Sequence, residues 1–320
     1  MPARGPSGPW QRLKPVDLDP LESMGLPSKG ETRLLDHKNQ ERYYTKIVER
    51  YLSFCSDATD RDALLHKFGS LSIGKERDRS SGTDTSIASA TTASTASTAS
   101  AASAASTAPV APPFPVPTLS QTGTKDLSAV LMALRKLREG IVASKRIDDF
   151  ATQAYLFNVR TAILVKHSES YHPAILYLLR TIHPKHPLTS FELREVTGYL
   201  VLDAACRRGD LADAFALRNC YKLRDAKVDT ILQALARDDF IAFGRVKRTV
   251  DGHQAKFLEF CEDGLRRHTL KCFGRAYLSV DVPYLEKATG ATFLELVERD
   301  GVGWHSDGSK VVIRSIKGRS

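Results

Sequence analysis

The chain has 320 residues, of which 42% are hydrophobic, and this composition is typical of a globular protein with one or two domains. Its formal net charge of +9 is compatible with a nucleic-acid or acidic partner but requires neither. Its five cysteines are an odd number and widely scattered, which argues against a disulfide framework. Because no run of 18 apolar residues and no leader-like N-terminus occurs, we expect no membrane association and a location in the cytoplasm, the nucleus or both.

The N-terminal part of the chain changes composition twice. Residues 1–30 are rich in Pro, Gly and Ser and are expected to be disordered. Residues 31–74 are predicted to form an amphipathic helical extension. Residues 75–123 are rich in Ala, Thr, Ser and Pro, and they have too few large apolar side chains to offset chain entropy. This segment is therefore expected to be a disordered linker, either a spacer or a platform for phosphorylation.

The helical extension contains one well-formed amphipathic helix, expected at roughly 36–55. Its apolar residues recur at steps of 3, 4, 7, 8 and 11 residues. A single helix of this length is marginally stable in water, so it must dock on the main domain or on a partner, and both remain open. The apolar stripe supplies four candidate protein-interface residues: Tyr44, Ile47, Val48 and Tyr51.

The region 124–278 consists almost entirely of helical patterns separated by short turns. The helix at 148–167 follows an acidic N-cap and is apolar on nearly every side, so it is expected to be central and buried. Ser190 is expected to cap the helix at 191–209. The remaining helices are expected at 127–144, 172–183 and 253–275. Their aromatic residues fall at helical spacing, which favours packing between helices.

Two very short connections indicate helical hairpins. Gly209 suits the position after one helix, and Asp210 suits the N-cap of the next. Residues 235–246 are predicted to form a second hairpin. Successive antiparallel helix pairs build a right-handed helical-repeat solenoid of the tetratricopeptide type, although no clean 34-residue period is present. The fold class predicted for this region is therefore mostly α.

The segment 279–316, followed by a tail at 317–320, has the pattern of a winged helix with a small β-hairpin. Asp281 can cap a first helix, and Thr292 with Glu295 forms the capping box of a second. Gly301 suits the end of that second helix, and Asp307-Gly308 is a strong hairpin signal between two apolar segments.

The charges of this segment argue against sequence-specific DNA binding. A helix that reads the major groove should present cations, yet the second helix carries Glu295, Glu298 and Asp300 against Arg299 alone. Positive charge lies on the preceding long helix and at the chain end. A sequence-tolerant contact with RNA there is one interpretation, and a solvated basic face is the other. The candidate RNA-contact residues are Arg266, Arg267, Lys271, Arg275, Arg314 and Lys317.

Candidate catalytic or metal-binding residues are few. The sequence contains no P-loop, no nucleophile elbow and no zinc-site spacing of cysteines. His183 and His186 lie three apart in a Pro-rich loop, and His268 with Cys272 is expected to be packed core rather than a nucleophile and its base. The acidic pairs at 148–149 and 238–239 are better explained as N-caps. We therefore expect no enzymatic activity, no cofactor and no metal.

A helical solenoid that runs into a winged helix is the layout of the PCI domain, and the chain resembles this superfamily over residues 125–315. The segments that carry the resemblance are "LREGIVASKRIDDFATQAYLFNVRTAILVKHSESYHPAILYLL" and "YLEKATGATFLELVERDGVGWHSDGSKVVIR". The chain is similar to the family that groups a proteasome lid subunit, signalosome subunit eight and initiation factor three subunit k. It also resembles the GANP-type mRNA-export branch.

This resemblance implies function by contact with other PCI-type subunits of a large complex. In such complexes the wing of one subunit adds edge-to-edge to the wing of another. An exposed hairpin edge suits this role, because unpaired backbone groups are a template for strand addition. The candidate interface residues of the wing are Trp304, Lys310, Val311, Val312 and Ile313. Trp304 is expected in the first strand of the wing, where it covers the core of the winged helix; an exposed platform for stacking bases is the alternative. The sequence therefore predicts a non-catalytic scaffold subunit that joins a multiprotein complex through its winged helix and its helical solenoid. The alternative is an RNA-binding adaptor in mRNA export or translation that uses the basic face of the winged-helix region.

Overall fold

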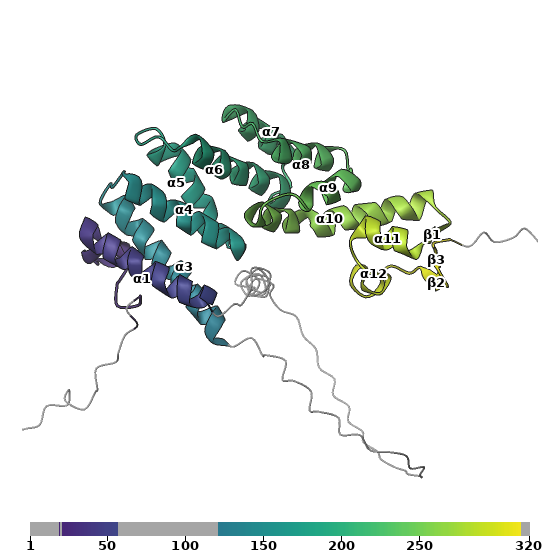
Figure 1. Cartoon of the computed structure of the whole chain (residues 1–320), viewed down its shortest axis with the longest axis horizontal. Helices are drawn as coiled ribbons and strands as arrows, with labels where there is room; N and C mark the ends of the chain where they lie inside the picture. Colours follow the sequence, from purple (N-terminus) through teal and green to yellow (C-terminus); the bar gives the residue numbers. More distant parts are fainter. Residues whose placement is uncertain (1–18, 20, 57–120, 315–320) are drawn as a thin grey trace, which may run out of the picture.

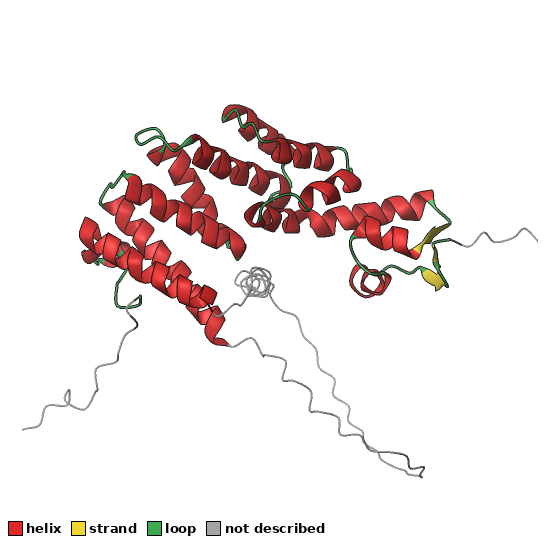
Figure 2. Cartoon of the chain, in the orientation of Figure 1, coloured by secondary structure: helices red, strands yellow, loops and turns green. Residues whose placement is uncertain are grey.

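The computed structural model describes residue 19, residues 21–56 and residues 121–314, and these residues form a mostly helical molecule (Figures 1 and 2). The expected tail at 317–320 and nearly all of the expected linker at 75–123 lie outside the described residues. Within the described ranges, no helix combines the length and apolar character needed to cross a bilayer. The α-helices are α1 (His37–Ser56), α3 (Gln121–Ala143), α4 (Asp149–Leu164), α5 (Ser168–Tyr177), α6 (Ser190–Leu202), α7 (Leu211–Cys220), α8 (Ala226–Ala236), α9 (Phe240–Lys247), α10 (Gly252–Ala276), α11 (Val282–Thr289) and α12 (Phe293–Asp300).

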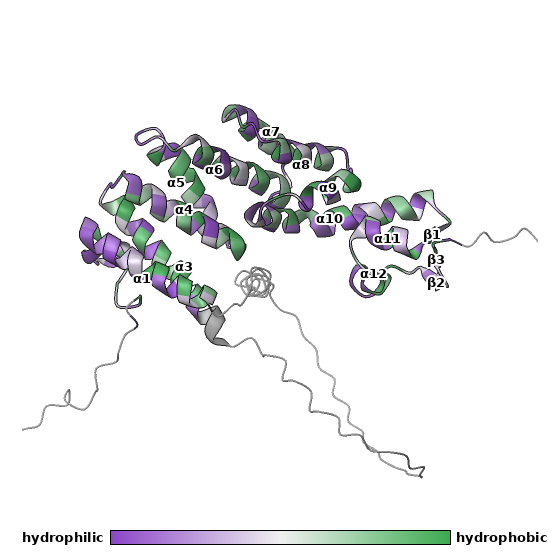
Figure 3. Ribbon diagram, viewed as in Figure 1, coloured by the Kyte–Doolittle hydropathy of each residue, from purple (hydrophilic) through white to green (hydrophobic). Residues whose placement is uncertain are grey.

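Helix α4 is buried on most sides, as its apolar sequence predicts. Asp148 caps it by accepting a hydrogen bond from the backbone N–H of Ala151, at 2.8 Å. Apolar and hydrophilic residues alternate on most of the other helices, so that one face packs inward (Figure 3). One large apolar cluster extends from α1 to the first half of α10. The predicted burial of α4 is thus confirmed.

Short caps and turns set the helix boundaries. Gly209 has a φ of +70°, and the Asp210 side chain accepts a hydrogen bond from Asp213 N–H at 2.9 Å, as expected for a helix end followed by a new N-cap. Helix α6, by contrast, is capped by Thr189 rather than Ser190. The prediction missed that Thr189 stands three residues before Glu192 and forms a capping box with it.

Two helices continue into single π-helical turns, η4 (Leu178–Ile182) after α5 and η5 (Asp203–Arg207) after α6. Asp203 at the start of η5 is fully buried. It accepts hydrogen bonds from the hydroxyl of Tyr171 at 2.7 Å and from the guanidinium of Arg207 at 2.6 and 2.8 Å. His172 Nδ1 lies 3.2 Å from the same carboxylate. This buried group therefore connects α5 with η5 by polar contacts inside an otherwise apolar core.

Helix α1 docks on α3 and α4 of the same chain. Of the two docking sites that the sequence left open, the main domain and a partner, the structure shows the main domain. The ring of Tyr44 meets Phe150 edge-on at 5.5 Å, and Tyr51 meets Phe157 in the same way at 5.2 Å. Ile47 is fully buried, and Val48 is half-buried. The apolar stripe of α1 therefore packs against the core of the same chain, and Ile47 has no exposed surface for a partner.

Residues 21–35, before α1, pack on α3, so the expected disorder of residues 1–30 does not hold for residues 21–30; residues 1–18 and 20 lie outside the described residues. Leu21 is buried, and its carbonyl accepts a hydrogen bond from the Tyr43 hydroxyl at 2.8 Å. The turns η2 (Pro27–Lys29) and η3 (Arg33–Leu35) follow it. At Gly140 a Cβ atom would stand 2.7 Å from the carbonyl oxygen of Leu34, so only glycine permits this close approach. The glycine that weakens α3 as a helix is therefore needed for docking.

The C-terminal segment forms a second, smaller apolar cluster around a three-stranded antiparallel sheet. The strands are β1 (Ser279–Asp281), β2 (His305–Asp307) and β3 (Lys310–Val312), in the order β1-β3-β2. Figure 1 places this sheet beside α11 and α12, at the far end of α10. The hairpin between β2 and β3 was predicted, but the first strand was not.

Candidate interaction surfaces of the C-terminal segment

Strand β3 lies in the middle of the sheet, which corrects the expectation that it offers an open edge. Val312 is paired with Ser279 on one side and with His305 on the other. Val311 is fully buried in the C-terminal cluster, while Lys310 is exposed. Because both edges of β3 are already hydrogen-bonded, the backbone edges open for strand addition belong to β1 and β2.

The two other residues assigned to the wing interface help to close the cluster. Ile313 follows β3, its backbone N–H donates to the Leu278 carbonyl at 2.8 Å, and its side chain is half-buried. Trp304 precedes β2 rather than lying in it. Its indole packs on α10, 3.7 Å from the point where a Cβ on Gly274 would stand. Trp304 thus covers the C-terminal core, as expected.

Helix α12 presents an apolar and acidic outer face. Its capping box is present as predicted: Thr292 N–H donates to the Glu295 carboxylate at 2.8 Å, and Gly301 ends the helix with a φ of +68°. Leu296 points inward and is fully buried. On the outer side, Leu294 is 66% exposed and Val297 is 38% exposed, with acidic residues between and after them. The sequence signal for this face was the i, i+3 spacing of two apolar residues on the solvent side of an amphipathic helix.

Arg266 was assigned to RNA contact, but it stabilises the packing of α12 on α10. Its side chain is 10% exposed, and its Nε donates to the Asp300 carboxylate, itself 8% exposed, at 2.9 Å. It also pairs with Asp263 one turn earlier. A guanidinium that is mostly buried and already paired with two carboxylates is poorly placed to bind a phosphate. The expectation for Arg266 is therefore corrected.

Three other candidate RNA-contact residues form an exposed strip on α10. Arg267, Lys271 and Arg275 stand four residues apart and are all exposed, so they lie along one face of the helix. In the described part of the chain, none of the three forms an ion pair, whereas Arg266 and Arg299 both approach Asp263. Arg314 Nε donates to the Gly274 carbonyl at 3.0 Å, which holds that cation beside the strip. Lys317 lies outside the described residues.

The buried face of α10 rotates along its length, and this overturns the expected burial of two residues. Phe257 is buried in the large cluster, but Phe273 is buried in the C-terminal one. His268 and Cys272 continue the stripe of Phe257 and therefore point to solvent, with His268 48% exposed. The prediction failed because it assumed one core for the whole helix, whereas α10 packs against two.

The described residues contain no cluster of three or more His, Cys, Asp or Glu that could hold a metal ion. His183 Nδ1 accepts a hydrogen bond from Leu188 N–H at 3.1 Å, and His186 Nε2 lies 2.8 Å from Asp149. Both histidines thus have local partners in or beside their loop. Asp148 and Asp239 are N-caps, as predicted. No protein-family model matches the chain, and no curated protein matches it either.

Proposed function

We propose that the protein is a non-catalytic adaptor subunit with the architecture of a PCI domain. In this proposal the helices from α3 to α10 form a right-handed, tetratricopeptide-like solenoid, and α11, α12 and the three-stranded sheet form a winged helix. The antiparallel pair α8 and α9 and the cap at Asp210 support the solenoid. The order of two short helices and a β-hairpin after a long helix supports the winged helix.

The observation that carries the adaptor function is the outer face of α12. In a winged helix this second helix is the one that would enter a DNA groove, where cations are needed. Here it exposes Leu294 and Val297 beside the carboxylates of Glu295 and Glu298. Exposed apolar side chains next to acidic ones suit the centre and rim of a protein contact and repel phosphate. A partner strand, if one adds to the sheet, pairs with β2 or β1, because β3 has no open edge.

Replacing Leu294 with Glu is expected to release the protein from its complex without unfolding it. The side chain is mostly exposed, so folding is hardly affected, whereas a charge at the centre of a protein contact costs several kcal/mol. The measurement is quantitative mass spectrometry of the proteins that co-purify with each variant. Phe191→Glu is the matched control, since Phe191 on α6 is similarly exposed at 60% and lies outside this face. Equal retention of partners by L294E and wild type would contradict the assignment of this face.

The second candidate function is an RNA-binding adaptor, and it rests on the α10 strip. Cations at i, i+4 and i+8 on one exposed helix face can follow a phosphate backbone without reading bases. The nearby Tyr277 is 45% exposed and could stack on a base.

Removing the strip tests this alternative. The triple variant Arg267→Ala, Lys271→Ala and Arg275→Ala is expected to weaken single-stranded RNA binding. It is also expected to make the negative slope of log K against log salt shallower by about 2, or roughly 0.7 for each lost phosphate contact. Lys38, Arg42 and Lys46 have the same spacing on exposed positions of α1, so their triple alanine variant controls for net charge. If both variants bind RNA equally, the α10 strip is not an RNA site.

A further inference from the structure

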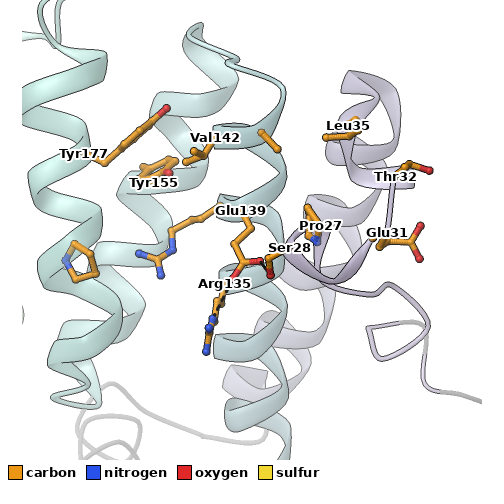
Figure 4. A pocket seen from close by; sticks show the side chains of 14 residues that line it. Pro27, Ser28, Glu31, Thr32, Leu35, Arg135, Glu139, Val142, Tyr155 and Tyr177 are labelled. Atoms are coloured by element: carbon orange, nitrogen blue, oxygen red, sulfur yellow. Dashed lines mark hydrogen bonds and ion pairs between the residues drawn. The ribbon is translucent and has the colours of Figure 1, made fainter.

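A groove opens between the stretch that precedes α1 and the three helices α3, α4 and α5 (Figure 4). It has a volume of about 720 Å³, within the range of small-molecule sites. Pro27, Thr32 and Leu35 line one wall, and Tyr155 and Tyr177 lie across from them, with α3 between. The close approach of Leu34 to Gly140 holds the first wall on α3. The groove therefore brings together segments that are far apart in the chain.

Most of the groove surface is apolar. Tyr155 and Tyr177 are stacked, with ring centroids 4.8 Å apart and planes at 19°. Leu35 and Val142 are large apolar side chains that remain 41% and 47% exposed at the groove. A concave, exposed apolar surface with a few polar groups is typical of a ligand-binding site.

The groove contains one cation without a counterion. Arg138 Nη1 donates to the Ser170 carbonyl at 2.9 Å, but its Nε is buried without an acceptor among the described residues. Burial lowers the pKa of this guanidinium. No carboxylate of the described residues forms an ion pair with it. Arg138 is half-buried and lines the groove, and a partly desolvated charge is costly unless it is paired, so this position favours an anion that enters with its own apolar cover.

The other charges of the groove neutralise one another. Glu139 accepts from Arg135 at 3.3 Å and from the Ser28 hydroxyl at 3.0 Å. Glu31 pairs with Arg33 at 2.8 Å. With these pairs in place, the uncompensated charge in the groove is the single positive charge of Arg138.

We propose that this groove binds a small organic anion with one carboxylate and an apolar body. The carboxylate pairs with the guanidinium of Arg138, and the apolar body lies against the stacked tyrosines and Val142. A singly charged amphiphile matches the one unpaired cation and the apolar walls, whereas a polyanion such as a phosphate ester would meet Glu139 and Glu31. This inference is independent of the proposed adaptor function, because the groove lies in the α3–α5 region and not in the C-terminal segment.

Calorimetric titration of the full chain with decanoate and with its neutral analogue decanamide tests the charge requirement. Wild-type protein is expected to bind decanoate at least about tenfold more tightly than decanamide, as a charge-assisted pair contributes more than 1.4 kcal/mol. Arg138→Gln is expected to abolish that preference. Arg135→Gln, which removes a cation already paired with Glu139, is expected to retain it.

A second pair of variants keeps the test valid if Arg138→Gln fails to fold. Val142→Glu places a carboxylate four residues after Arg138, where it can pair with the guanidinium and compete with decanoate. Val142 is exposed, so folding is expected to be retained. Met132→Glu adds the same charge at a similarly exposed position of α3, 48% exposed, that does not line the groove.

The expected result is that V142E loses most of its affinity for decanoate while M132E binds like wild type. The proposal is overturned if wild type does not bind decanoate, if it binds decanamide equally well, or if V142E and M132E bind decanoate alike.

Discussion

Replacing Asp203 with Ala is expected to lower the free energy of unfolding by about 1–3 kcal/mol, the cost of leaving the fully buried hydroxyl of Tyr171 without its acceptor. The carboxylate is fully buried, and its loss leaves the guanidinium of Arg207 and the hydroxyl of Tyr171 without their acceptor. Denaturant unfolding followed by circular dichroism measures the change. Asp229→Ala is the matched control, because its ion pair with Arg218 is about 30% exposed on both sides and contributes about 0–1 kcal/mol. Equal effects of the two variants would contradict the role assigned to Asp203.

The same carboxylate predicts a pH dependence. Burial alone would raise the pKa of Asp203, but the hydrogen bonds from Arg207 and Tyr171 outweigh burial and lower it below the ordinary value of 3.8. A group whose pKa is lower in the folded state stabilises the fold above its ordinary pKa, and this contribution is lost as the pH falls through the lowered value. The stability difference between wild type and Asp203→Asn is therefore expected to be largest above about pH 4 and to shrink below it. A difference that does not change with pH would contradict this account.

Replacing Arg266 with Ala is expected to loosen α12 from α10, at a cost of about 3 kcal/mol to the C-terminal cluster. Asp300 would remain nearly buried without its cation. Since the C-terminal cluster is separate from the larger one, the effect is expected to be local, as faster hydrogen exchange of α11 and α12 with little change in α4. Arg267→Ala is the control on the adjacent, exposed position. Unchanged exchange of α12 in R266A would contradict the structural role of Arg266.

The sequence predicted most helices of the chain because their signals are local. The caps at Asp148, Asp210 and Thr292 lie within three residues of the backbone groups that they satisfy. The cap of α6 was placed one residue late, since Thr189 and Ser190 are both good caps. The three-residue strand β1 was missed because Ser279–Asp281 is too short to show an alternating pattern.

The positions of candidate interface residues depended on contacts distant in sequence, and these were predicted less well. A hairpin pattern does not reveal that a third strand pairs with β3, so the pattern alone predicts an open edge there. Nor does the charge of Arg266 reveal that Asp300, 34 residues later, neutralises it. The groove around Arg138 was also missed, because its walls come from stretches separated by about 100 residues. In each case tertiary packing, and not local propensity, decided which side chains reach the surface.

The most direct measurement of the central proposal is affinity purification of the protein from cells, with mass spectrometry of its partners before and after ribonuclease treatment. An adaptor that binds proteins through the apolar and acidic face of α12 is expected to retain stoichiometric protein partners after the nuclease. Partners that disappear with the nuclease would contradict this account and would identify RNA as the ligand and the α10 strip as the working surface.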